Sequence, residues 1–387
     1  MPLAGGFVSK LDLKKKEIKV PLVVYFCKKC LLLQVKDSVN DKILFKNYKY
    51  SSSTIPSLKD HFKSYSEKIK KKFLKKKSVK LLEFGANDGV LLLNFKKDKK
   101  FFCLGVDPAK NITKLAKKKN LNYFVGLFNE NNSKKIKKKF GKFDFITGSN
   151  VFAHIDNIHS VVKASKELLK SDGDFVTEVH YLPNLISLNQ YDFIYHEHVN
   201  YYTLTSMVKL FDMHDMNLYK FEKVKTHGGS IRVYISLNKM KRKSQQLLDI
   251  IKSEKKINKS YFKKFIEKSI KQKNYLKKLL INLRNKKKSV IGYGASGRGT
   301  ILLNFCKIDK YLVKSIIDES PLRYGKYMPG VKIPIKNFNY FLKKNKEIDY
   351  IFIIAWNYSS SVIKKVKRIN DRIKFIIPFP LPKIINK

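Results

Sequence analysis

Residues 195 to 202 of this 387-residue chain read YHEHVNYY, so that an acid, two imidazoles and several phenols share eight positions. Each of these polar side chains would need a hydrogen-bond partner if it were buried, and an apolar core therefore has no use for such a run. Acids, imidazoles and phenols are the groups that transfer protons in enzymes. The run predicts a catalytic site, and a hydrogen-bonded loop that supports a sheet is the alternative.

A motif of a different kind, LEFGANDGVLL at residues 81 to 91, joins an apolar run to two glycines. Glycine lets a ligand approach the backbone where a side chain would clash, so the motif predicts a nucleotide-cofactor loop between a strand and a helix. Asp107 lies about twenty residues beyond the loop, where a carboxylate can bind both hydroxyls of a ribose. Asn150 and His154 follow another apolar run, at a position where open α/β sheets bind ligands. A strand, turn and helix with ordinary turn glycines is the alternative.

A second glycine motif, Gly292-x-Gly294-x-x-Gly297, follows an apolar run and opens a predicted helix. Backbone amides and the helix dipole make such a turn an anion site. Asp318 ends the next apolar run, so the motif taken by itself predicts dinucleotide binding, with NAD as the ligand. A domain without any ligand is the alternative, because a lone motif of this type is a weak signal.

The motifs lie among short apolar runs that alternate with lysine-rich helical stretches, which is typical of βαβ units and parallel sheets. Residues 241 to 288 contain neither glycine nor proline and predict a long helix or a helix pair. We expect a first sheet with strands at 79–84, 101–106, 123–125, 143–147 and 174–179, closed by an antiparallel pair at 219–224 and 231–237. We expect a second doubly wound sheet with strands at 289–293, 315–318, 350–356 and 374–379, and short strands at 20–26 and 31–35 before a helix near 57–73.

The formal net charge of +51 would ordinarily favour a nucleic-acid partner. Seven of the 82 basic residues are arginine, and the lysines are scattered in short runs. Nucleic-acid sites favour arginine forks with aromatic residues on one face. We therefore interpret the charge as solvated surface lysine and expect no nucleic-acid partner; a polyanion-binding role is the alternative.

The lengths of the apolar runs and the number of cysteines indicate where in the cell we expect the protein. No apolar run approaches the roughly 18 residues that span a bilayer, and the start lacks a signal-peptide layout, so we expect no membrane partner. Four cysteines in a chain of this length do not make a disulfide framework. A reducing cytoplasm fits this cysteine content. The sequence gives no signal of an oligomeric state.

With these motifs in view, the chain resembles the S-adenosylmethionine-dependent sugar C-methyltransferases, which act on nucleotide-linked keto-deoxysugars. The resemblance covers almost the whole chain, and its YHEH block and final glycine motif are specific. It rests on PLAGGF, CKKC, YKYSSST, the cofactor motifs, YHEHVNYYT, HGGSIRVY and GYGASGRGT. It implies an α/β protein with a class I methyltransferase Rossmann-like sheet, a second C-terminal Rossmann-like domain and a small N-terminal lobe. The implied segments are 1–75 (lobe of the zinc-binding type), 76–240 (methyltransferase domain), 241–287 (helical linker) and 288–387 (nucleotide-sugar-binding domain).

The resemblance also implies ligands and roles. S-adenosylmethionine would bind to the first glycine motif, with Glu83 facing its methionine ammonium and Asp107 its ribose; the implied cofactor residues are Glu83, Gly85, Asn87, Gly89, Asp107, Asn150 and His154. The nucleotide-linked keto-sugar would bind through its diphosphate at Gly294 and Gly297, with Arg298 as charge partner and Asp318 near a ribose or base. His227 would line the same cleft, although a hairpin turn explains that residue nearly as well.

Methylation of carbon needs a base that removes a proton next to a ketone and a group that stabilises the enolate oxygen. We favour His198 as the base, because neutral imidazole is available near pH 7. Glu197 would orient its ring, Tyr195 would donate to the enolate, and Tyr50 or Tyr48 would reach in from the lobe. His196 would pack elsewhere, since adjacent side chains of an extended segment face opposite ways.

Two alternatives for the whole protein remain at the level of sequence. One is a NAD-dependent sugar-nucleotide oxidoreductase that uses the second glycine motif, although no Ser-Tyr-Lys set is recognisable. The other is a binding protein or a methyltransferase acting on RNA.

The N-terminal lobe departs from the family it resembles. Members usually have a first C-x-x-C pair upstream of the PLA segment, which completes a four-thiolate zinc site. This chain begins at that segment and keeps only Cys27 and Cys30, while Cys103 lies on a predicted strand and Cys306 in the final domain. Structural zinc needs four ligands. We therefore do not expect zinc, and we expect the lobe to be truncated, annotated from the wrong start or metal-free.

Overall fold

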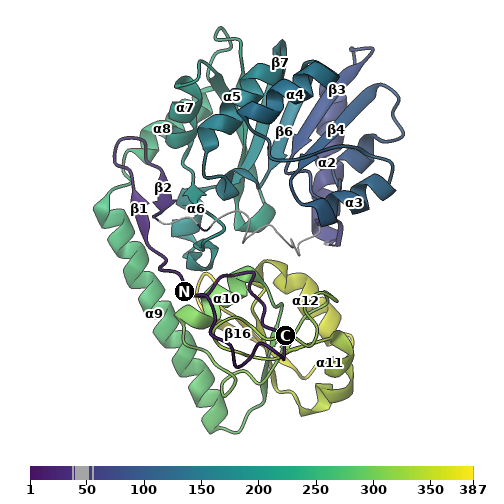
Figure 1. The fold of residues 1–387 in the computed structure, drawn as a ribbon. Coiled ribbons are helices and arrows are strands. Elements are labelled where there is room, and N and C mark those ends of the chain that lie inside the picture. Colours follow the sequence, from purple (N-terminus) through teal and green to yellow (C-terminus); the bar gives the residue numbers. More distant parts are fainter. Residues whose placement is uncertain (37–38, 40–51, 55, 387) are drawn as a thin grey trace.

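The structure is a computed structural model that describes residues 1–36, 39, 52–54 and 56–386. Figure 1 shows two α/β units, one above the other, with the short N-terminal strands beside them and the long helix α9 along one flank. A seven-stranded and a six-stranded sheet form the two units, and a three-stranded sheet lies with the N-terminal strands. Among the described residues, no helix has both the length and the apolar composition needed to cross a bilayer.

The seven-stranded sheet has the order β5-β4-β3-β6-β7-β10-β9. Its first five strands are parallel, and β10 pairs antiparallel with both β7 and β9, as expected for the closing pair. Apolar runs buried on both faces produce such parallel strands. The strands are β3 (Val79–Phe84), β4 (Phe101–Asp107), β5 (Asn122–Val125), β6 (Phe143–Ser149), β7 (Leu169–His180), β9 (Asn217–Val224) and β10 (Ser230–Ser236). Helices α3 (Lys110–Lys118), α4 (Glu130–Phe140), α5 (Ile158–Leu168), α6 (Leu182–Ser187) and α7 (Leu204–Asp212) connect or cover them.

Helix α2 (Pro56–Lys72) belongs to the core of this sheet. Its buried residues Leu58, Phe62 and Ile69 share one apolar cluster with strand residues such as Val79 and Leu81. The expected division at residue 75 assigned this helix to the N-terminal lobe. The seven-stranded sheet instead covers its apolar face. The boundary was placed at the lysine run before Val79, and this run gives no sign of that packing.

The six-stranded sheet has the order β13-β12-β11-β14-β15-β16, which is a doubly wound arrangement with a switch point between β11 and β14. All pairs are parallel except β15 with β16. The strands are β11 (Val290–Tyr293), β12 (Ile316–Ile317), β13 (Ile335–Lys336), β14 (Tyr350–Ile353), β15 (Lys374–Ile377) and β16 (Lys383–Ile385). The helices are α10 (Gly297–Phe305), α11 (Phe338–Lys344) and α12 (Ser359–Lys367).

The small sheet joins the N-terminal segment to the polar block. Strand β2 (Leu33–Val35) pairs with β1 (Val24–Phe26) on one side and with β8 (Asn200–Tyr201) on the other. The block at 195–202 therefore ends in a strand of the N-terminal sheet, which fixes its position. The expected helix pair is present as α8 (Gln245–Glu254) and α9 (Lys259–Asn285).

Candidate active site

The first glycine motif forms a turn at the carboxyl end of β3, and Asp107 braces it. Gly85 and Gly89 have positive φ angles of 61° and 79°. The two carboxylate oxygens of Asp107 accept hydrogen bonds from the backbone N–H groups of Asn87 and Ala109, each at 2.9 Å. A carboxylate oxygen can accept more than one hydrogen bond, so this bracing leaves capacity for ribose hydroxyls.

Glu83 is the penultimate residue of β3, just before this turn, and is almost fully buried. Its Oε2 atom has no hydrogen-bond partner among the described residues. Burial, and then the charges of Asp107 and Asp88, raise the pKa of Glu83 well above its usual value. A buried acceptor without a donor costs free energy that a cationic ligand would recover. The site therefore fits the methionine ammonium of S-adenosylmethionine.

Ser52 and Ser53 contact the same turn. The backbone N–H of Ser52 donates to Asn87 Oδ1 at 2.9 Å, and Ser53 donates to the Asp88 carboxylate through its N–H and its hydroxyl. These contacts of Ser52 and Ser53 with the cofactor loop were not predicted from the sequence. Tyr50 and Tyr48, the predicted phenols, lie outside the described residues.

The tightness of the turn can be tested with Gly85→Ala. A Cβ atom at position 85 would lie 2.7 Å from Val151 Cγ2, and the φ angle is one that side chains rarely adopt. We expect this variant to lose about 1–3 kcal/mol of folding free energy and to bind S-adenosylhomocysteine more weakly. Thermal unfolding and calorimetric titration measure both effects. A variant with unchanged stability and affinity would show that the turn has room to spare.

His198 lies where the polar block meets the carboxyl end of β6. Its imidazole packs edge-on against that of His154, with ring centroids 4.7 Å apart, and the neighbouring Val199 N–H donates to the Ala153 carbonyl at 2.7 Å. Asn150 ends the same strand region in a left-handed conformation. The structure thus brings His198, the predicted base, next to His154, a predicted cofactor residue.

Two hydrogen bonds fix the tautomer of His198. Its Nδ1 lies 3.2 Å from the Phe193 carbonyl, which can only accept, so Nδ1 carries the proton. In the neutral ring Nε2 is therefore the acceptor nitrogen, and the Tyr195 hydroxyl donates to it at 2.9 Å. This arrangement leaves Nε2 as the basic nitrogen, with a phenol beside it.

Glu197 does not orient this ring, contrary to expectation. Its carboxylate accepts a hydrogen bond from the backbone of Gly5, and its burial raises its pKa. The reason is local: the His198 N–H donates to the Tyr195 carbonyl at 2.9 Å, so the block is a turn rather than an extended segment. Positions 195 and 198 then face one side while Glu197 faces the N-terminal segment. His196 is buried and approaches the Val20 carbonyl, which agrees with a packing role.

The second glycine motif repeats the design of the first. Gly294 has a φ of +94°, and Asp318 accepts from the Ala295 N–H at 2.7 Å, as Asp107 does from Asn87. Ser296 caps helix α10 by accepting from the Gly299 N–H at 3.1 Å. Among the described residues, no acceptor is found for the N–H groups of Ser296 and Gly297. These two donors at a helix N-terminus suit an anion.

The surroundings of this motif differ from the expectation in two ways. Arg298 pairs with Asp192 at 2.7 Å and lies 3.6 Å from the centroid of the Phe193 ring, so its charge is already used between the two α/β units. A Cβ atom on Gly297 would lie 3.2 Å from that of Ala4, so the N-terminal segment covers part of the motif. His227 lies in the turn between β9 and β10, and its side chain is outside what the structure describes.

The two cysteines of the lobe lie in a turn, with the Cys30 N–H 3.4 Å from Cys27 Sγ. Hydrogen bonds from Cys30 lower the pKa of Cys27. Among the described residues, no group of three or more potential metal ligands is found. Two thiols do not complete the four-ligand set of structural zinc, so the lobe as described does not fit that metal.

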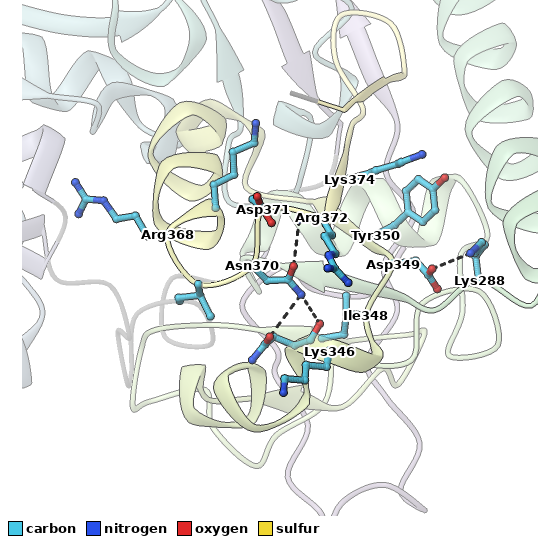
Figure 2. A pocket seen from close by; sticks show the side chains of 13 residues that line it. Lys288, Lys346, Ile348, Asp349, Tyr350, Arg368, Asn370, Asp371, Arg372 and Lys374 are labelled. Atoms are coloured by element: carbon cyan, nitrogen blue, oxygen red, sulfur yellow. Dashed lines mark hydrogen bonds and ion pairs between the residues drawn. The ribbon is translucent and has the colours of Figure 1, made fainter.

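A cavity of about 880 Å³ lies elsewhere, at the amino ends of strands β14 and β15. Figure 2 shows that charged side chains line it, among them Lys288 paired with Asp349. It is on the edge of the C-terminal sheet opposite to the glycine motif. None of the residues predicted to bind substrate lines it.

Comparisons with known proteins cover the chain in three successive parts. A family described as a putative zinc binding domain matches residues 1–45, a methyltransferase domain family matches 58–220, and a C-methyltransferase C-terminal domain family matches 225–380. C-methyltransferase NovU of Streptomyces niveus is 28% identical over 390 residues, which cover 100% of this chain and 92% of NovU.

Solved structures resemble the chain more distantly. The plantazolicin methyltransferase BpumL in complex with SAH matches with a TM-score of 0.37 and 13% identity, over 46% of this chain and 82% of that one. An S-adenosylmethionine-dependent methyltransferase of Clostridium acetobutylicum matches with a TM-score of 0.35 and 16% identity, over 46% of this chain and 92% of that one.

The fold of the seven-stranded unit and the family matched to it define an S-adenosylmethionine-dependent methyltransferase of class I. The chain is similar, in this order, to a putative zinc binding domain, a methyltransferase domain and a C-methyltransferase C-terminal domain, which is the architecture that the sequence resemblance implies.

Proposed function

We propose that the enzyme methylates a carbon next to the keto group of a nucleotide-linked deoxysugar and that His198 is the base. The observation that carries this proposal is the fixed tautomer of His198, whose Nε2 lone pair lies beside the Tyr195 hydroxyl and next to His154. A neutral imidazole with this orientation can remove a proton from an activated carbon at neutral pH.

S-adenosylmethionine, when bound, supplies an electrophilic methyl group. His198 Nε2 takes the proton from the carbon next to the ketone, and Nδ1 keeps its hydrogen bond to the Phe193 carbonyl, which stabilises the imidazolium. The Tyr195 hydroxyl, which donates to Nε2 in the substrate-free arrangement, turns to donate to the enolate oxygen. Tyr50 is proposed as a second phenol, and Glu197 as a residue that positions the block against Gly5.

The nucleotide of the substrate is proposed to bind at the second glycine motif. The N–H groups of Ser296 and Gly297 would take the diphosphate, and Asp318, which holds the turn in place, would accept from a ribose hydroxyl. Arg298 would contribute to this site as part of its pair with Asp192 rather than as a free charge. His227 would line the sugar side from the turn between β9 and β10.

We also propose that the enzyme works in the cytoplasm on this small substrate and not on nucleic acid. All four cysteines are free thiols, which suits a reducing compartment. The basic residues are scattered lysines rather than arginine forks.

A solvent-exchange experiment tests this function without turnover. The enzyme, S-adenosylhomocysteine and a panel of dTDP- and UDP-linked keto-deoxysugars are incubated in D2O. We expect one carbon-bound proton next to the ketone to exchange for deuterium, seen by NMR, because the base acts before methyl transfer. The same samples with NADH instead of S-adenosylhomocysteine test the oxidoreductase alternative. Reduction of the ketone by NADH, or absence of exchange across the panel, would contradict the proposal.

A further inference from the structure

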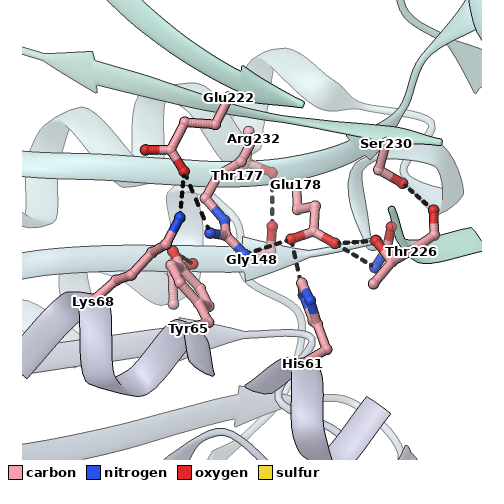
Figure 3. A network of polar contacts seen from close by, with 12 residues as sticks. His61, Tyr65, Lys68, Gly148, Thr177, Glu178, Glu222, Thr226, Ser230 and Arg232 are labelled. Atoms are coloured by element: carbon pink, nitrogen blue, oxygen red, sulfur yellow. Dashed lines mark hydrogen bonds and ion pairs between the residues drawn. The ribbon is translucent and has the colours of Figure 1, made fainter. Parts of the chain in front are cut away.

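Glu178, near the end of β7, is a buried carboxylate that the proposed chemistry does not use. Its oxygens contact four side chains, and Figure 3 shows three of these, those of His61, Thr226 and Arg232. Oε2 binds Arg232 of β10 at 2.9 Å and His61 of α2 at 3.1 Å. Oε1 accepts from the Thr226 hydroxyl at 2.7 Å and from Asn150 Nδ2 at 3.5 Å.

The carboxylate is charged throughout the physiological range. Burial acts to raise its pKa, but His61, Arg232 and Thr226 together outweigh burial and lower the pKa to about 2. An ionised carboxylate only accepts hydrogen bonds, so each of its partners must donate. Arg232 is itself held in place above the Tyr65 ring, 3.7 Å from its centroid. The cluster therefore has one fixed hydrogen-bond pattern.

One oxygen of this carboxylate contacts both Asn150 and Thr226. Asn150, on the side proposed for the cofactor, also donates its backbone N–H to the Glu178 carbonyl at 2.7 Å. Thr226 begins the short helix Thr226–Gly228, the turn proposed to line the sugar site. Asn150 and Thr226 thus share one carboxylate oxygen as their acceptor.

The other oxygen joins the carboxylate to the cofactor loop by a second route. His61 lies on helix α2, and Ser52 and Ser53, which precede this helix, bind Asn87 and Asp88 of the loop. Contacts through α2 therefore connect the loop to Glu178. Arg232 balances the charge of the carboxylate, and Thr226 and Asn150 supply hydrogen bonds to its remaining lone pairs.

We propose that Glu178 is a positioning residue that couples binding of the methyl donor to ordering of the 226–230 turn on the acceptor side. The coupling rests on the proposed function of that turn and deepens it. A donor that orders Asn150 and the loop reduces the cost of ordering the turn that shares the same carboxylate. The enzyme then completes its acceptor site only when the cofactor is bound.

Hydrogen–deuterium exchange with S-adenosylhomocysteine as the probe tests this coupling. In the unmodified enzyme the probe is expected to slow amide exchange in residues 226–230 about fivefold or more, in addition to protecting the 85–89 loop. Thr226→Val removes the hydroxyl while Glu178 keeps its other donors, so no charge is left unpaired. We expect this variant to protect the loop as before and to lose the protection of the turn. Thr226→Ser keeps a hydroxyl and should restore it.

The outcomes separate coupling from a structural role. Unchanged protection of the turn in Thr226→Val, or no protection in the unmodified enzyme, would overturn the proposal. A loss of affinity for S-adenosylhomocysteine by more than about tenfold in Thr226→Val would also overturn it, because the contact would then merely hold the fold together. The probe involves no acceptor, so a wrong sugar assignment leaves this experiment readable and is judged by the solvent-exchange assay.

Discussion

His198→Ala is expected to lower kcat by about three orders of magnitude while leaving the affinity for S-adenosylhomocysteine within about twofold. The reason is that Nε2 is the nitrogen left with a lone pair once Nδ1 donates to the Phe193 carbonyl. Without it, the proton next to the ketone has no acceptor at that place. Steady-state kinetics and calorimetric titration of the same preparation measure the two quantities.

The control for this variant is His214→Ala. His214 and His159 form an exposed imidazole pair on the outer surface, with nitrogens 2.8 Å apart, and neither belongs to the proposed site. The His214→Ala variant, which breaks this pair, should have an unchanged kcat. Because His198 also bonds Tyr195, its variant should be compared by thermal unfolding as well. Turnover within about tenfold of the unmodified enzyme would remove His198 from the role of base.

Much of the fold could be predicted because local sequence determines it. Apolar runs such as Val79–Phe84 and Phe101–Asp107 are buried on both faces of a parallel sheet, so hydrophobicity alone marks them. The turn glycines at 85 and 294 could also be predicted from local sequence. A positive φ angle directly after a strand favours glycine over other residue types. Repetition of the Asp107 and Asp318 contacts follows from similar spacings, since donor and carboxylate are 20 residues apart in the first unit and 23 in the second.

The rest depends on contacts between distant residues. The ion pair of Arg298 with Asp192 joins residues that are 106 positions apart in the sequence, and no local sequence pattern predicts it. Glu197 was assigned to the wrong neighbour because the direction of its side chain depends on whether the block is a turn or an extended segment. The residues of the YHEH block are compatible with both conformations. Glu178 did leave a signal, a charged residue inside the apolar run FVTEVH, but its partners His61 and Arg232 cannot be read from the sequence.

Glu83→Gln is expected to weaken binding of S-adenosylhomocysteine about 10- to 100-fold, because a hydrogen bond from an ammonium to a buried carboxylate contributes about 1.5–3 kcal/mol. In the free enzyme burial and two neighbouring acids raise the pKa of Glu83, whereas the bound ammonium lowers it. Binding below the raised pKa must therefore release a proton, and affinity should rise with pH until that pKa is passed and then level off. Calorimetry between about pH 5 and 8, in two buffers of different ionisation enthalpy, measures the released proton. Glu67→Gln, at an exposed position of α2, is the matched control. A Glu83→Gln variant that keeps the same pH dependence would place the ammonium away from this carboxylate.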